Sequence, residues 1–176
     1  MKISQYLKFV IPLVLAFLLV SCQKADPPPG TPVTVQRVLS GQTVEVRRQN
    51  GQIPVIETVR LLGIEAPDLK QDPWGTEAKA YLQQWLENQP VLLESDVETT
   101  DSYQRRLGYL WKDNILVNEQ LVKEGYVLAN SRWPNTQYEQ RLADAQIWAR
   151  IMKRGIWHPQ QPLRQTPAEF RRTQRS

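Results

Sequence analysis

The chain carries the stretch VRLLGIEAPD at residues 59–68, in which an apolar strand ends and a loop with two carboxylates begins. Arg60 lies within the strand, and Glu65 and Asp68 follow in the loop. A second arginine, Arg105, comes later in a separate polar segment. Two guanidinium groups can bind and neutralise a phosphate, while a carboxylate activates water or helps to hold a cation. These residue types therefore point to chemistry on a phosphodiester.

The segments around this stretch predict mainly β structure. Apolar and polar residues alternate in several short runs, and Asn50-Gly51 between two of them is a strong hairpin signal. Pro90 precedes the fourth run, and the turn at 112–114 follows the fifth. The expected strands cover residues 33–38, 43–47, 55–62, 91–97 and 106–111.

Three helices are predicted between and after these strands. The first runs from the cap Asp72-Pro73 to about Asn88, and the second from Asn118, as its cap, to Gly125. The third begins near residue 135 or 136 and closes at Gly155. Five short strands concentrated in the first half favour a small barrel over a βαβ sheet, so we expect an α+β, mainly β fold.

Residues 1–21 predict a lipoprotein signal peptide. Two lysines give a basic start, residues 9–20 are almost wholly apolar, and the run is short for a membrane span. The sequence LVSC at 19–22 resembles a bacterial lipobox, whose cysteine is lipidated. Cys22 is the only cysteine, so no intrachain disulfide competes for it. We expect secretion across the inner membrane and lipid anchoring in the bacterial cell envelope; a plain secretory signal or an uncleaved anchor are the alternatives.

The remaining chain divides into a spacer, one domain and a tail. Residues 22–32, with PPPG at 27–30, predict a stiff polyproline linker, and residues 33–158 form the domain. Residues 159–176 are expected to be a basic, disordered tail. Removal of residues 1–21 lowers the net charge from +4 to +2, which by itself does not indicate nucleic acid. No obligate protein partner is evident.

Several separated motifs follow one another in one order over about residues 33–157. They are SGQT at 40–43, RLLGIEAPD at 60–68, WGTEA at 74–78, DSYQR at 101–105, VNEQLVKEG at 117–125 and GIW at 155–157. These motifs resemble those of the staphylococcal nuclease (thermonuclease) family. The resemblance implies a five-stranded OB-type β-barrel with three helices, and a nuclease acting on DNA and/or RNA.

The resemblance assigns catalytic roles to Arg60 and Arg105. Their planar guanidiniums would make paired hydrogen bonds to the phosphate oxygens as negative charge grows in the transition state. The alternative for each is a surface salt bridge. Tyr103 would bind the phosphate or stack on a base, or instead be partly buried at the barrel rim. Arg106 is the weaker candidate, because a strand would turn it to the opposite side from Arg105.

The acidic loop departs from the family pattern. There the loop reads Asp-Thr/Ala-Pro-Glu, with the aspartate binding calcium and the glutamate acting as general base; this chain exchanges the two acids. A second calcium aspartate of the family is Gln42 here. The resemblance implies a calcium site made by Gln42, Glu65 and the carbonyl of Ala66, weakened because one carboxylate is lost.

Asp68 takes the position of the general base. Its side chain is shorter than glutamate by roughly 1.5 Å, about one carbon–carbon bond, and a displacement of about 1 Å can cost on the order of a hundredfold in rate. A shifted loop backbone would restore the distance, as would an exchange of roles between Glu65 and Asp68. The other interpretation is a solvated polar loop without a catalytic role.

Three functions from different classes are therefore carried forward. The first is an envelope-anchored, metal-dependent nuclease with an altered calcium site. The second is an OB-fold nucleic-acid-binding module whose catalysis is weakened, and the third is a structural lipoprotein. The nuclease predicts metal-dependent cleavage. The binding module predicts salt-sensitive binding of nucleic acid without cleavage, and the structural lipoprotein predicts no binding of nucleic acid.

Overall fold

The computed structural model describes residues 28–50 and 53–174. The predicted signal peptide and Cys22 lie outside the described residues. Among the helices of those described residues, none is both long enough and apolar enough to cross a membrane.

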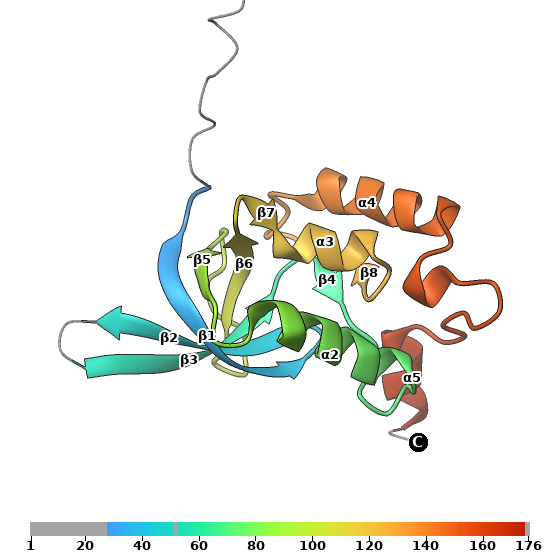
Figure 1. Cartoon of the computed structure of the whole chain (residues 1–176), viewed down its shortest axis with the longest axis horizontal. Helices are drawn as coiled ribbons and strands as arrows, with labels where there is room; N and C mark the ends of the chain where they lie inside the picture. The colour runs from blue at the N-terminus through green and yellow to red at the C-terminus, as the bar shows by residue number, and fades with distance from the viewer. Residues whose placement is uncertain (1–27, 51–52, 175–176) are drawn as a thin grey trace, which may run out of the picture.

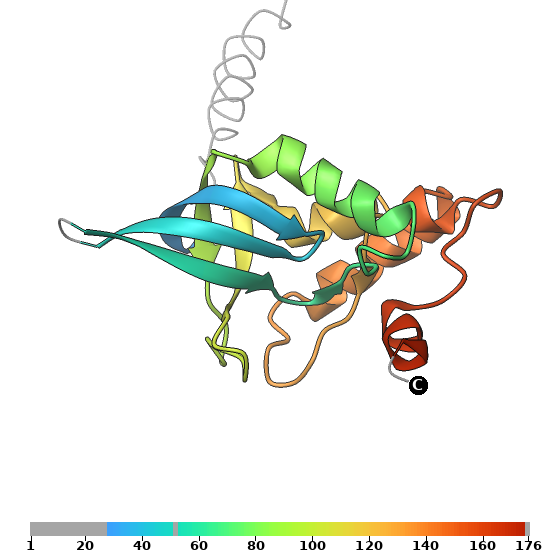
Figure 2. The same cartoon turned by 90° about the horizontal axis from the view of Figure 1, so that it is seen from below.

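Residues 31–112 contain the strands that close into a β-barrel (Figures 1 and 2). The main sheet has the order β3-β2-β1-β5-β6-β7, and β3 also pairs with β6 in parallel, with Val59 opposite Arg106. This pairing joins the two ends of the five-stranded run, so the α+β, OB-type barrel prediction is confirmed. Its strands are β1 (Thr31–Ser40), β2 (Thr43–Asn50), β3 (Ile53–Leu61), β5 (Pro90–Glu94) and β6 (Arg106–Lys112).

Of three two-residue strands, one adds to the barrel sheet and two form a separate small sheet. β4 (Ile64–Glu65) pairs with β8 (Leu128–Ala129), and β7 (Ile115–Leu116) pairs with β6. The start of β1 also differs from the predicted domain boundary. Thr31 and Pro32 pair with β5, opposite Leu93 and Leu92, so the end of the expected spacer belongs to the sheet.

Three helices follow the predicted ones with shifted bounds. They are α2 (Trp74–Leu86), α3 (Val117–Lys123) and α4 (Glu139–Ile151). Asn118 does not cap α3 but lies fully buried inside it. Its side-chain oxygen accepts the Leu110 N–H at 3.1 Å, and its amide donates to the Leu62 carbonyl at 2.8 Å. The buried Leu110 N–H and Leu62 carbonyl both require a hydrogen-bond partner, and Asn118 supplies it. This requirement outweighs the local preference of asparagine for a helix cap.

The expected disordered tail contains a fourth helix, α5 (Pro167–Thr173), after the short 3-10 helix η2 (Gly155–Trp157). Thr166 and Glu169 form a reciprocal capping box, and Pro167 occupies the first turn. A capping box and an N-terminal proline are both helix-start signals. The prediction was wrong because it weighed the polar composition of the tail above this local signal.

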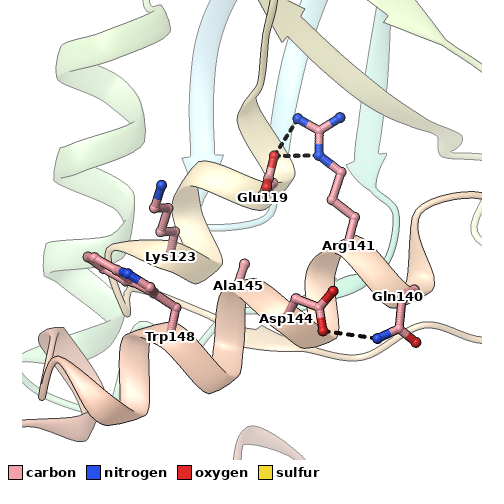
Figure 3. A pocket seen from close by; sticks show the side chains of 7 residues that line it. All are labelled: Glu119, Lys123, Gln140, Arg141, Asp144, Ala145 and Trp148. Carbon is pink, nitrogen blue, oxygen red and sulfur yellow. Dashed lines mark hydrogen bonds and ion pairs between the residues drawn. The ribbon is translucent and has the colours of Figure 1, made fainter.

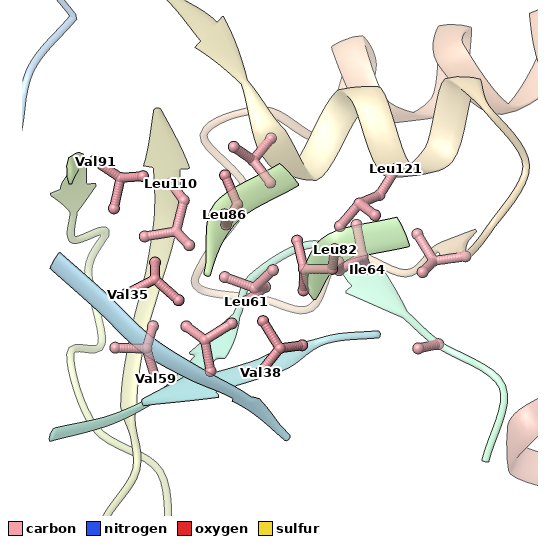
Figure 4. Close-up of a cluster of buried hydrophobic side chains, with 14 of the residues drawn as sticks. Val35, Val38, Val59, Leu61, Ile64, Leu82, Leu86, Val91, Leu110 and Leu121 are labelled. Carbon is pink, nitrogen blue, oxygen red and sulfur yellow. The ribbon is translucent and has the colours of Figure 1, made fainter. Parts of the chain in front are cut away.

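The hydrophobic core fills the space between the barrel and helices α2, α3 and α4 (Figure 4). Inward-facing β1 residues such as Val35 meet Leu61 from β3 and Leu82 from α2, and all three are fully buried. Burying one such side chain contributes about 1.5–3 kcal/mol. The core therefore fixes the end of β3, where the predicted site begins.

Candidate functional site

Arg60 is held at the end of β3 by the backbone that follows it. Its Nη1 donates to the Leu61 carbonyl, and its Nη2 donates to the Ile64 carbonyl at 2.7 Å. Gly63 makes this return of the chain possible with a φ of +70°, and a Cβ there would lie 2.3 Å from Leu142. The guanidinium is thus positioned by a turn that only glycine fits.

Four arginines converge on this point. Burial, followed by the charge of Arg105, lowers the pKa of Arg60 to about 10. Arg132 and Arg171 lower it further, while Glu65 acts in the opposite direction. Arg105 and Glu65 therefore lie near enough to Arg60 to act on its charge, and the catalytic and metal-binding roles of the three residues stay predictions. The excess of positive charge makes the cluster a site for an anion.

Arg105 is oriented by Asp101 in the same turn. Its Nε and Nη2 contact Asp101 Oδ2 at 2.8 and 2.7 Å, and its backbone N–H donates to Oδ1 at 3.0 Å. Burial acts to raise the pKa of Asp101, but the hydrogen bonds from Arg105 hold it below its usual value. The pair is partly buried, with the Arg105 and Asp101 side chains 30% and 18% exposed, and it sets the direction of the guanidinium.

Tyr103 stands beside Arg105 and is 76% exposed, with its ring centroid 5.4 Å from the guanidinium carbon. The alternative of burial at the barrel rim is therefore wrong. Arg106 contacts Ser95 and Glu57 instead, at 3.3 and 3.9 Å, so it leaves the Arg105 side of the strand as expected. Substrate contact by Tyr103 stays a prediction.

The three predicted metal residues lie in one place, and the side-chain oxygens of Gln42 and Glu65 are already bonded to other residues. Gln42 Oε1 accepts the Ala66 N–H at 2.6 Å, which joins the first turn to the acidic loop. Glu65 is buried, and its Oε2 accepts from Asn130 Nδ2 at 2.9 Å. Its Oε1 forms an ion pair with Arg171 of α5.

This arrangement does not fit a calcium ion. Calcium binds through six to eight oxygens, and its affinity rises with the number of carboxylates. In the described part of the chain no group of three or more His, Cys, Asp or Glu side chains could hold a metal. Both oxygens of Glu65 and the side-chain oxygen of Gln42 accept hydrogen bonds from the protein itself.

Asp68 lies on the turn that enters α2. Its Oδ1 accepts the Lys70 N–H at 3.0 Å, and its own N–H donates to Gln71 Oε1 at 2.9 Å. The helix start is pressed against this turn, since a Cβ at Gly75 would lie 1.9 Å from the Asp68 carbonyl oxygen. The carboxylate is thus placed by its own turn and not by contacts with the arginines, and its role as a base stays a prediction.

Sequence reasoning missed three residues of this cluster, namely Asn130, Arg132 and Arg171. Asn130 and Arg132 lie in the segment after β8, which carries no local signal for a site. Arg171 lies in the segment 159–176, for which the sequence analysis predicts a disordered tail. The capping box at Thr166 and Glu169 was the signal that would have placed it on a helix.

A separate groove of about 470 Å³ lies between α3 and α4 (Figure 3). Glu119 and Arg141 face each other across it as an ion pair, and Trp148 lines its far end. It contains none of the predicted site residues. The candidate site is therefore the arginine cluster at the barrel end.

Comparisons with known proteins agree with the fold and the motifs. Residues 58–159 match the family model of the staphylococcal nuclease homologues. A thermonuclease of Staphylococcus hyicus is 34% identical over 128 residues, covering 70% of this chain and 73% of that protein. A thermonuclease of Staphylococcus intermedius is 34% identical, over 73% and 77% of the two chains.

A longer protein, endonuclease YhcR of Bacillus subtilis, is 30% identical over 78% of this chain and 12% of its own length. The barrel, the ordered motifs and these matches lead to one assignment. The chain belongs to the family of staphylococcal nuclease homologues.

Proposed function

We propose that this chain is a nuclease that hydrolyses phosphodiester bonds of DNA and/or RNA with the residues of the arginine cluster. The family and its thermonuclease and endonuclease relatives support the reaction class. The observation that carries the proposal for these residues is the convergence of Arg60 and Arg105 beside Glu65. A phosphate is the anion that such a cluster suits, because planar guanidiniums match its oxygens.

The two arginines have different parts in this proposal. A guanidinium carries five N–H donors, and Arg60 uses two of its nitrogens on backbone carbonyls. Its remaining donors and its fixed charge would stabilise the phosphate oxygens as charge develops. Arg105, oriented by Asp101, would contact the same phosphate from the β6 side. Tyr103, exposed next to it, would stack on a base of the substrate.

Asp68 is proposed as the general base. Its turn is held from two sides, by Gln71 and by the close approach of Gly75. A water beside Asp68 would lose its proton to the carboxylate as it attacks phosphorus, and the leaving oxygen would depart on the opposite side. Calcium remains part of the proposal as the cofactor, but the donors as arranged do not fit it, so no step is derived through the ion.

Envelope anchoring is a proposal that rests on sequence alone. The segment 9–20 and the lipobox-like LVSC at 19–22 support it. A Cys22→Ala variant would then lose incorporated fatty acid and move from the membrane fraction to the soluble secreted fraction. Retention of the variant in the membrane would point to the uncleaved anchor instead.

The function is tested by cleavage of single-stranded DNA and RNA. Every described element lies within residues 28–174, so protein beginning at Gln23 contains the whole barrel. Calcium, magnesium, manganese and a chelator would be compared, with the double variant Arg60→Ala, Arg105→Ala beside the parent. Metal-dependent cleavage that disappears in the double variant is the expected result.

The ion pair between Glu65 and Arg171 supports the second candidate function, a nucleic-acid-binding module. If the ion pair with Arg171 persists, the arginines still bind a phosphate but no metal joins them. That candidate predicts binding whose affinity falls with salt, is weakened by Arg60→Ala, and is accompanied by cleavage in none of the tested metals.

A further inference from the structure

We propose that Arg171 of α5 occupies the place of a divalent cation against Glu65, so that metal binding and α5 docking compete for one carboxylate. The inference rests on the proposed function and deepens it, because the family resemblance implies that Glu65 is the carboxylate that would hold the proposed calcium cofactor. It resolves the disagreement between the metal that the family resemblance implies and a donor set that does not fit one.

The first support is the way in which Glu65 is satisfied. Its side chain is 8% exposed, and that of Arg171 is 39% exposed. A buried carboxylate needs a charged or hydrogen-bonding partner for each oxygen. Arg171 supplies the positive charge on one oxygen, and Asn130 supplies an N–H on the other. The only formal charge that balances Glu65 by direct contact therefore comes from α5, among the residues that the structure describes.

The second support is that α5 is docked at the same loop by separate contacts (Figure 1). Gln71, which also holds the Asp68 backbone, donates to the Gln165 carbonyl at 3.0 Å. Pro167 is buried at the start of the helix. A helix of seven residues is too short to be stable without such tertiary contacts. Docking at the acidic loop and the formation of α5 are thus expected to be coupled.

The third support is the charge of the surroundings. Arg60 is repelled by the positive charge of Arg171 as well as by those of Arg105 and Arg132, so Arg171 adds to an excess of positive charge that Glu65 offsets. With Gln42 in the first turn, Glu65 is the one carboxylate among the three predicted metal residues, Gln42, Glu65 and Ala66. A calcium ion and the Arg171 guanidinium cannot share its oxygens, because both need them within a direct contact distance.

The test is a calcium titration by isothermal calorimetry on protein beginning at Gln23. Arg171→Ala removes the competing cation, while Arg172→Ala removes the exposed neighbouring charge on the same helix and is the matched control. If the docked form outnumbers the open form by about ten to one, Arg171→Ala lowers the apparent Kd for calcium by about tenfold. Arg172→Ala is expected to leave it close to that of the parent.

A second readout follows α5 directly. Amide hydrogen exchange of the segment 163–174 is measured by mass spectrometry in the parent, with and without saturating calcium. Competition predicts that calcium speeds exchange in this segment and leaves exchange in β1 and β3 unchanged. Charge reversal by Arg171→Glu is expected to speed it without calcium, because two carboxylates then repel each other.

Equal calcium affinity in the parent and Arg171→Ala would overturn the inference, and so would the absence of calcium binding in both. Unchanged exchange of 163–174 at saturating calcium would also overturn it. These outcomes are separate from failure of the proposed function, which appears as equal cleavage by the parent and the Arg60→Ala, Arg105→Ala variant. Competition for Glu65 can hold in a protein that binds nucleic acid without cutting it.

Discussion

The end of β3 and the acidic loop position their charged side chains by opposite means. Arg60 is held by two carbonyls from the next few residues, on a strand anchored in the core by Leu61. Glu65, only five residues on, is held by Asn130 and by Arg171 from the last helix. The arginine therefore depends on local backbone and barrel packing, while the carboxylate depends on partners brought by the tertiary fold.

This difference indicates which part of the site is able to change state. Breaking the Arg60 contacts would require the turn at Gly63 to move, and that turn packs against α4 through Leu142. Releasing Glu65 from Arg171 requires only that a short helix leave the surface. The position of Arg60, the proposed phosphate-binding residue, is thus expected to stay fixed. The contacts of Glu65, the predicted metal-binding residue, are expected to change when α5 leaves the surface.

The largest effect is expected from removing the two arginines that are proposed to bind the phosphate. Arg60→Ala with Arg105→Ala is predicted to reduce kcat/KM for single-stranded DNA by about 10⁴-fold or more, because each lost charge-stabilising donor costs about 10²–10³. Arg47→Ala, which removes an exposed arginine from β2, is the matched control and should retain activity. A loss below tenfold in the double variant would show that these arginines are not the phosphate-binding residues.

The next prediction compares how much a core residue of β3 and a residue of α5 contribute to the free energy of unfolding. Leu61→Ala creates a cavity in the core and is predicted to lower the free energy of unfolding by about 2–5 kcal/mol. Pro167→Ala, at the start of α5, is predicted to lower it by less than about 1 kcal/mol, because α5 covers the domain without forming its core. Urea denaturation followed by tryptophan fluorescence measures both. Similar losses would mean that α5 is an integral part of the fold.

A smaller effect is expected from restoring the family residues in the first turn and in the acidic loop. Gln42→Asp with Asp68→Glu adds a metal carboxylate and extends the base, and is predicted to raise calcium-dependent cleavage by about 10–100-fold. Asp68→Glu alone serves as the control for the base. No gain, or a loss, would show that the backbone has adapted to Gln42, whose side-chain oxygen now accepts the Ala66 N–H.

The smallest effect concerns pH. Because the pKa of Arg60 is lowered to about 10, its guanidinium loses its proton and its charge as the pH rises through that value. Cleavage of DNA is therefore predicted to be constant up to about pH 9 and to fall by about tenfold at one pH unit above the pKa. The pH profile of kcat/KM measures this decline.

Arg132→Ala tests the direction in which a neighbouring charge shifts the pKa of Arg60. Removing a neighbouring positive charge raises the pKa of Arg60, so the decline should move to higher pH. A profile that stays flat through pH 11 in the parent would contradict the lowered pKa. A decline that moves to lower pH in the variant would contradict the assigned electrostatic contribution of Arg132.

Residues with a local signal were predicted well, and residues placed by distant contacts were not. Alternation along β1 and β2 was sufficient for the barrel, whereas the catalytic roles that the motifs at 60–68 and 101–105 indicate for the two arginines stay predictions. Asn118 shows the limit, since a residue that resembles a helix cap became a buried bridge between α3 and the barrel. Its role depends on Leu62 and Leu110, which periodicity alone does not bring together.

The sequence by itself determined the barrel and the place of Arg60 on it, because period-2 burial and short motifs act over a few residues. Only the tertiary structure decided the partner of Glu65. Arg171 is 106 residues away in the chain, and no local pattern encodes that distance. Burial of a carboxylate requires a counter-charge from wherever the fold can supply it, and in this protein the fold supplies it from α5.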